Sequence, residues 1–293
     1  MPPALRRLLT PTRSPAADLT AMQAARPQWA SDSLGRLLGH IRLSSDFYSL
    51  GQFDSCTWHV RQAWRMAGPT QCRQQPGEVV LLANALGFYH YQRAAYDSAL
   101  TCFQAGSRVF RAAGLDSSYV EPLPRLPSGA SWAGGSALAI CVTNMGLASR
   151  HLGDLAGAVR YYEQATALYQ QLQQPAGLVW LQCLTGEAYA EQNDCPRARA
   201  AYDQAVRMAR RYVPRNPAYG VIELAGVVLN YYEPLLLAQP QPPAYARQLA
   251  REMMTGLRHY YSRRQATDTA NYCIRMAQLR VVLAEVAWRA GQP

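Results

Sequence analysis

The chain has 293 residues, of which 49% are hydrophobic and 16% are charged, a balance typical of a globular protein and not of a disordered one. Its formal net charge is +10, and all 29 basic side chains are arginine. The lack of lysine excludes Walker phosphate loops, protein kinases and Schiff-base enzymes, because each of these needs a lysine amine. We attribute the arginine excess first to codon bias in a GC-rich genome. The alternative is an acidic partner, since arginine binds carboxylates and phosphates through two donors at once.

The sequence carries no signal for secretion or for insertion into a membrane. Residues 1–17 lack an apolar core of signal-peptide length, and we expect residues 1–30 to form a disordered or weakly ordered segment. No stretch approaches the ~18 uninterrupted apolar residues of a membrane span. The seven cysteines form no CxxC pair and are odd in number, which predicts free thiols in a reducing compartment. We therefore expect a cytoplasmic protein without a membrane span.

Residues 31–293 are predicted to form one array of helical hairpins, and the first unit spans about residues 33–66. Gly51 is expected in the turn of this hairpin, because glycine adopts the backbone that ends a helix. Cys56, Val60 and Ala63 then follow at the spacing of one helix face, and we expect them to face the core. This unit is the most degenerate of the array.

Three later units, at about residues 78–114, 137–174 and 177–213, share one spacing. In each, a glycine is followed by an alanine twelve residues later and by an aromatic residue four further on. Glycine inside a helix costs about 1 kcal/mol relative to alanine, so its recurrence indicates the close approach of a neighbouring backbone. One hairpin cannot bury its apolar face alone, whereas stacked hairpins can. The signature residues are Gly87, Ala99 and Phe103, then Gly146, Ala158 and Tyr162, then Gly186, Ala198 and Tyr202.

A segment rich in proline, serine and glycine interrupts the array at residues 115–136, and we predict a loop insertion there. A further unit is expected at 217–262, with Gly226 at the repeated position and 40 residues after Gly186. A terminal helix is expected at 268–290. This helix has two interpretations: it is a solvating cap of the array, or the chain is the front part of a longer protein.

The glycine, alanine and aromatic positions resemble those of the tetratricopeptide repeat (TPR) family over residues 80–212. The first-position tryptophan of that family is absent, and a step of 40 residues instead of about 34 implies longer helices or loops. The resemblance implies an all-α fold. Its architecture would be a right-handed α-solenoid of antiparallel helix pairs, a TPR-like superhelix with a repeat length of about 40.

The resemblance also implies a concave groove, lined in that family by the first helix of each hairpin, that binds an extended peptide. Asn144 lies where groove asparagines hold a peptide backbone, because an amide donates and accepts at once. The alternative is an amide satisfied within its own hairpin. Arg150 and His151 either supply charge for an acidic ligand or form a solvated surface pair, which we favour. The groove candidates are Asn84, Phe88, Tyr91, Gln92, Asn144, Leu147, Arg150, His151, Glu187 and Glu191.

No constellation of catalytic or metal-binding residues emerges from the sequence. Glu187 and Glu191 lie one helical turn apart, but no histidine stands at ligand spacing beside them, which favours an exposed helix face. The five histidines are dispersed along the chain. We therefore name no catalytic residue and no metal ligand, and we expect no cofactor.

These observations predict a non-catalytic scaffold that binds a protein or peptide, with an acidic ligand fitting the basic charge. One alternative is the sensory or docking region of a larger signalling regulator, whose partner is a downstream domain of the same polypeptide. A second alternative is a nucleic-acid-associated protein, although nucleic acid is the less favoured partner. Its arginine-rich C-terminal face would include Arg207, Arg210, Arg211 and Arg215.

Overall fold

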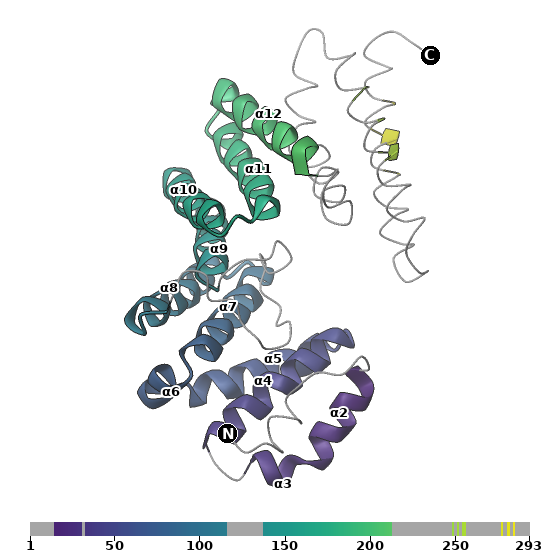
Figure 1. The fold of residues 1–293 in the computed structure, drawn as a ribbon, viewed down its shortest axis with the longest axis vertical. Coiled ribbons are helices and arrows are strands. Elements are labelled where there is room, and N and C mark those ends of the chain that lie inside the picture. The colour runs from purple at the N-terminus through teal and green to yellow at the C-terminus, as the bar shows by residue number, and fades with distance from the viewer. Residues whose placement is uncertain are drawn as a thin grey trace. The chain divides into compact units, whose positions relative to one another are not determined.

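The structure is a computed structural model that describes residues 15–30, 33–115 and 137–212, with a few single positions between 248 and 284. The chain divides into two compact units, Met1–Leu172 and Gln173–Pro293. Every regular element of the described ranges is a helix, so the predicted all-α class is confirmed (Figure 1). Apart from those single positions, the expected unit at 217–262, with its Gly226, and the terminal helix at 268–290 lie outside the described residues. So does most of the expected loop insertion.

The helices follow one another as paired elements (Figure 1). They are α2 (Pro15–Ala24), α3 (Arg26–Trp29), α4 (Ser33–Ser49), α5 (Phe53–Met66), α6 (Pro69–Gln74), α7 (Pro76–Gln92), α8 (Tyr96–Ala112), α9 (Ala137–His151), α10 (Leu155–Gln171), α11 (Pro175–Glu191) and α12 (Cys195–Tyr212). In the first unit α4 packs on α5, α7 on α8, and α9 on α10. Because α7 also packs on α5 and α9, neighbouring hairpins share their core. In the second unit α11 packs on α12.

The turn within each hairpin has a left-handed residue at the same register position. Gly51, Ala94, Gly153 and Asn193 have φ values of 72°, 56°, 82° and 60°. Each lies five residues before the small buried residue of the second helix. Left-handed backbone reverses the chain after a helix, and it favours glycine or asparagine because it crowds a Cβ atom. The prediction that Gly51 lies in a hairpin turn is confirmed.

The aromatic ring of each signature lies against the glycine sixteen positions earlier. A methyl group on Gly146 would lie 2.6 Å from Cδ1 of Tyr162, and the same distance applies to the other two pairs. All three rings are at most 1% exposed. The space that a side chain would take is therefore filled by the ring itself, and not by the neighbouring backbone that the spacing suggested. The other pairs are Gly87 with Phe103 and Gly186 with Tyr202.

Replacing Gly146 with alanine should lower the free energy of unfolding by about 1 kcal/mol, measured by urea denaturation. Overpacking costs about 1–3 kcal/mol and outweighs the ~1 kcal/mol that alanine gains in helix propensity. The control is the same substitution in a Tyr162→Leu background, where the ring is gone and Gly146→Ala should be neutral or stabilising. An equal loss in both backgrounds would show that the ring is not the constraint.

Residues 15–30 fold against α4, although the sequence suggested a weakly ordered segment over 1–30. Met22 and Trp29 are 1% and 2% exposed, and Nε1 of Trp29 donates a hydrogen bond to the Met22 carbonyl at 2.8 Å. Gly39 of α4 leaves room for the indole ring. The burial of one large ring orders this segment. Periodicity does not reveal it, because Trp29 precedes the first hairpin.

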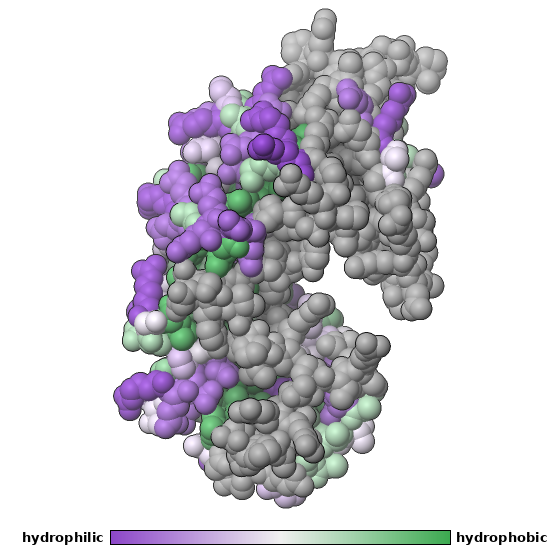
Figure 2. All heavy atoms as spheres, in the orientation of Figure 1, coloured by the Kyte–Doolittle hydropathy of each residue, from purple (hydrophilic) through white to green (hydrophobic). Residues whose placement is uncertain are grey.

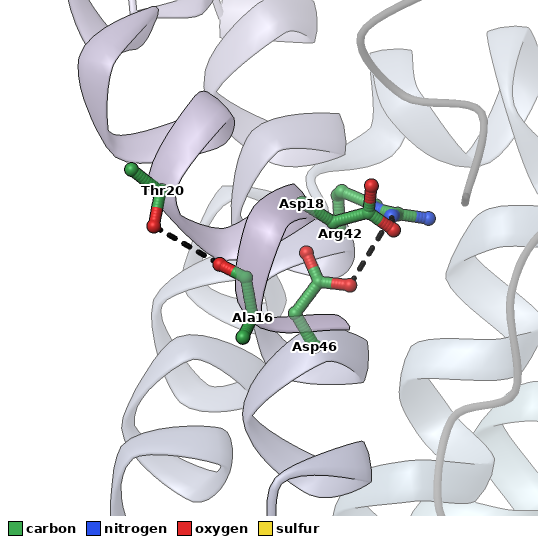
Figure 3. A network of polar contacts seen from close by, with 5 residues as sticks. All are labelled: Ala16, Asp18, Thr20, Arg42 and Asp46. Atoms are coloured by element: carbon green, nitrogen blue, oxygen red, sulfur yellow. Dashed lines mark hydrogen bonds and ion pairs between the residues drawn. The ribbon is translucent and has the colours of Figure 1, made fainter. Parts of the chain in front are cut away.

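A buried ion network joins α2 to α4 (Figure 3). Nη2 of Arg42 lies 2.5 Å from Oδ2 of Asp18 and 3.2 Å from Oδ1 of Asp46. All three side chains are at most 7% exposed, so one guanidinium faces two carboxylates away from water. Burial raises the pKa of Asp46 to about 6; Arg42 opposes this rise and the charge of Asp18 adds to it. The Asp46 carboxyl of the folded chain is therefore largely protonated below about pH 6 and negatively charged above it.

Replacing Asp46 with asparagine should reveal this raised pKa as a pH-dependent difference in stability. The folded chain holds the Asp46 proton more tightly than the unfolded chain does, so this group stabilises the fold near pH 4 and loses that contribution as the pH rises through about 6. The variant cannot titrate there. Its free energy of unfolding relative to wild type should therefore rise by about 1–3 kcal/mol between pH 4 and pH 7.5. A difference that stays constant across this range would contradict the raised pKa.

Hydrophilic side chains lie outermost on the described helices, with hydrophobic ones between them, as the face in Figure 2 shows. The main exceptions cluster at the α4–α5 turn, where Tyr48, Leu50 and Phe53 are 36%, 36% and 59% exposed. Among the described helices, none is long and apolar enough to cross a membrane.

Candidate functional site

In the compact unit Met1–Leu172, the groove candidates lie on α7 and α9. Each of these is the first helix of its hairpin, and the two pack against each other. Exposure rises along each helix toward its C-terminal end. The asparagines, in the middle of the helices, are buried at 0% and 1% exposure. One turn later the side chains are partly buried, and at the helix ends they are exposed. The partly buried candidates are Phe88, Tyr91, Leu147 and Arg150, and the exposed ones are Gln92 and His151.

The two asparagines have different environments. Nδ2 of Asn84 donates to the carbonyl of Ala137 at 3.5 Å, across the interface between α7 and α9. The same amide also acts as a hydrogen-bond partner of the Cys141 thiol. In the described part of the chain, neither Nδ2 nor Oδ1 of Asn144 has a partner. Asn84 thus links two hairpins through Nδ2, although its Oδ1 also has no partner there, whereas both the donor and the acceptor of the buried Asn144 amide are unused.

The C-terminal ends of α7 and α9 meet in an aromatic rim formed by Phe88, Tyr91, Tyr96 and His151. The ring of Tyr91 stacks on Phe88 at 6.2 Å between centroids and meets His151 edge-on at 5.2 Å. Tyr96 stacks on His151 at 4.5 Å with an interplanar angle of 9°. Burial raises the pKa of Tyr91, and the nearby Arg150 guanidinium opposes the rise. The structure therefore brings the groove candidates of two successive hairpins into one contact network.

Sequence reasoning missed Tyr96 as a member of this rim. It is the first residue of α8, on the second helix of a hairpin, whereas the family resemblance directs attention to first helices only. Its contact with His151 depends on α8 packing on α9, across the insertion at 115–136. No spacing within one hairpin contains this information.

The remaining groove candidates, Glu187 and Glu191, lie on α11 in the second unit, one partly buried and the other exposed. The rim of the first unit is built from α7, α8 and α9 alone. Among the described residues, no three histidine, cysteine, aspartate or glutamate side chains form a group suited to a metal ion.

The cysteines of the described ranges are free thiols, as predicted for this chain. Burial raises the pKa of Cys56 and of Cys141 to about 12 and that of Cys102 to about 11. A thiol with a raised pKa carries little thiolate and is a poor nucleophile at neutral pH. These three cysteines therefore act as small apolar core residues.

Two of the arginines considered for nucleic acid, Arg207 and Arg211, are exposed on α12. The side chain of Arg210 and all of Arg215 lie outside the described residues. The described part of the chain thus shows two members of that face and does not define a footprint.

Asn144→Leu and Asn84→Leu should change stability in opposite directions. Leucine at 144 removes a buried amide whose desolvation is not compensated, so the free energy of unfolding should rise by about 1–2 kcal/mol. Leucine at 84 removes the hydrogen bond to Ala137 and should lower stability by about 1 kcal/mol. The two substitutions change helix propensity equally, so urea denaturation of both isolates the hydrogen-bond effect. Destabilisation by Asn144→Leu would mean that its amide has a partner in solution.

Comparison with known proteins agrees with this geometry. The profile of the tetratricopeptide repeat family matches residues 138–211, which include α10, α11 and most of α9 and α12. Residues 138–211 therefore match the tetratricopeptide repeat family, and the described helices have the fold of a helical repeat protein. No curated protein sequence matches it at a significant level.

Solved structures with the same fold cover most of the chain at low sequence identity. The apo form of RapI is 11% identical, with a TM-score of 0.59, and the match covers 95% of this chain and 92% of that one. BtubC from P. vanneervenii is 14% identical, with a TM-score of 0.51 and coverages of 99% and 92%. A Rap protein complexed with competence and sporulation factor is also 14% identical, with a TM-score of 0.51 and coverages of 97% and 72%. At these identities the likeness concerns the fold.

Proposed function

We propose that this protein is a non-catalytic scaffold that binds an extended, acidic peptide segment of a partner protein along α7 and α9. The observation that carries the proposal is the buried Asn144 amide, which has no hydrogen-bond partner in the described part of the chain and lies two helical turns before His151 of the rim. A buried polar group without a partner costs about 1–3 kcal/mol, so its presence calls for a compensating role.

A peptide backbone provides what Asn144 lacks. Each peptide unit has one donor and one acceptor, and a primary amide can satisfy both at once. Because Asn144 is only 1% exposed, neighbouring side chains must shift as the ligand enters. Peptide binding would then give the Asn144 amide its hydrogen bonds, and this stabilisation exists only in the complex.

The rim supplies surface and charge for the side chains of the ligand. Tyr91 and His151 offer flat ring surfaces at the ends of the two helices, and aromatic residues are enriched in binding surfaces for this reason. Arg150 is the nearby cation, and the net charge of +10 attracts acidic segments over a longer range. An acidic peptide therefore fits better than a basic one.

The fold comparison is consistent with a binding role. One structure of similar fold, the Rap protein, is a complex with competence and sporulation factor. At 14% identity this likeness transfers the architecture, and the ligand of the present chain follows from its own residues.

Selection from a displayed library of random peptides would test the proposal. The full chain should enrich acidic peptides. Fluorescence anisotropy should then show that these peptides bind Asn144→Leu and Arg150→Gln at least about tenfold more weakly than wild type. Each substitution removes a hydrogen bond or charge contact of about 1.5 kcal/mol. Arg160→Gln is the matched control. Because Arg160 is an exposed arginine on α10, the Arg160→Gln variant should bind the enriched peptides with wild-type affinity.

Two outcomes would contradict the proposal. One is the absence of any enriched peptide with a chain shown to be folded. The other is equal affinity of wild type, Asn144→Leu and Arg150→Gln for the enriched peptides, which would place the binding surface elsewhere.

A further inference from the structure

The compact unit Met1–Leu172 contains a cavity between α2, α3, α4 and α5, away from the groove candidates on α7 and α9. Its volume is about 370 Å³, within the range of small-molecule sites. The residues that matter for its chemistry are Arg26, Trp29, His40, Trp58 and His59. Neither the repeat signature nor the proposed peptide site uses any of them.

Aromatic rings form the walls of this cavity. Trp29 meets His40 edge-on at 5.7 Å, and Trp58 lies 5.6 Å from His40 and 4.8 Å from His59. Trp29 is fixed by its hydrogen bond to the Met22 carbonyl, whereas Trp58 is 52% exposed. A half-exposed indole beside a cavity offers a flat apolar surface that a planar ligand can cover.

Among the described residues that line the cavity, Arg26 is the only one with a permanent charge. Its side chain is exposed, and it forms no ion pair within the described part of the chain. The described lining of the cavity contains no acidic side chain to balance it. An aromatic cage of this kind often binds cations, but the unpaired guanidinium disfavours a cation and favours an anion.

The two histidines hydrogen-bond to each other through their Nδ1 atoms, 2.8 Å apart. Burial lowers the pKa of both, with that of His59 at about 4, so both rings are neutral at pH 7. When one neutral ring donates from Nδ1, the accepting ring carries its proton on Nε2. The pair therefore keeps one ring N–H donor. The short Nδ1 separation is that of a hydrogen bond, and the described residues offer no third side chain for a metal.

We propose that this cavity binds a small planar aromatic carboxylate. The ring of the ligand would stack on Trp58 between the histidine and tryptophan walls, and its carboxylate would pair with Arg26. The remaining imidazole N–H provides a second donor for the same carboxylate. This ligand matches the cavity in size, in planarity and in charge.

Isothermal titration calorimetry on the full chain would test the proposal with three probes. These are 1-naphthoate, its neutral counterpart 1-naphthamide, and cyclohexanecarboxylate, which keeps the charge without the aromatic ring. We expect naphthoate to bind and each of the other two to bind at least about tenfold more weakly, since one loses the charged hydrogen bond and the other loses the stacking.

Two substitutions assign the binding to this cavity. Arg26→Gln should weaken naphthoate binding about tenfold, and Trp58→Leu about fivefold. Both side chains are exposed enough for the variants to fold, which circular dichroism would verify. Arg36→Gln, an exposed arginine on α4 that does not line the cavity, is the matched control and should bind as wild type does.

The proposal is overturned if naphthoate at millimolar concentration releases no heat of binding. It is also overturned if naphthamide binds as well as naphthoate, or if Arg26→Gln and Arg36→Gln bind equally well. Asn144→Leu should leave naphthoate binding unchanged, so this site and the peptide site stand or fail separately.

Discussion

The contact between a signature aromatic ring and the glycine sixteen residues earlier is the constraint on which the hairpins depend. It fixes the distance between the first and second helix, because the ring occupies the volume of the missing side chain. The alanine twelve residues after the glycine keeps the helices close at the neighbouring turn. Because this geometry is repeated, successive hairpins can pack against each other and share a core. Helix α7, for example, packs on both α5 and α9.

Such dense packing leaves little tolerance for polar groups, which makes the few buried ones informative. Asn84 is accommodated because the first residue of α9 offers it a carbonyl. Asn144 lies one register position later in the next hairpin, two residues before its glycine, and neither polar atom of its amide has a partner among the described residues. The contrast between Asn84, whose Nδ2 links two hairpins, and Asn144, whose amide makes no hydrogen bond there, is the basis of the proposed peptide site.

The N-terminal helices show two opposite charge arrangements a short distance apart in sequence. Nη2 of Arg42 contacts the carboxylates of Asp18 and Asp46 in a buried ion network. Arg26 has no acidic neighbour among the described residues of its cavity and lies beside aromatic rings. The first arrangement joins helices, whereas the second leaves a cation available to a ligand. The α2–α3 segment contributes to both, which gives it a role that a weakly ordered tail would not have.

The sequence alone determined the helical class, the hairpin units between residues 33 and 212, and the residues of the glycine–aromatic contact. These follow from local spacing, since a helix places positions twelve and sixteen residues later on predictable faces of its partner. It also identified the turn at Gly51, because backbone chirality restricts which residues end a helix.

Only the tertiary structure decided which of these residues have a use beyond packing. Whether an asparagine is satisfied depends on a carbonyl 53 residues away, and the rim needs Tyr96 and His151 to meet across an insertion. The cavity near Trp58 requires four helices at once. Hydrogen bonds and ring contacts between distant segments depend on atomic positions to within a fraction of an ångström, and a periodic pattern of residue types does not fix positions at that precision.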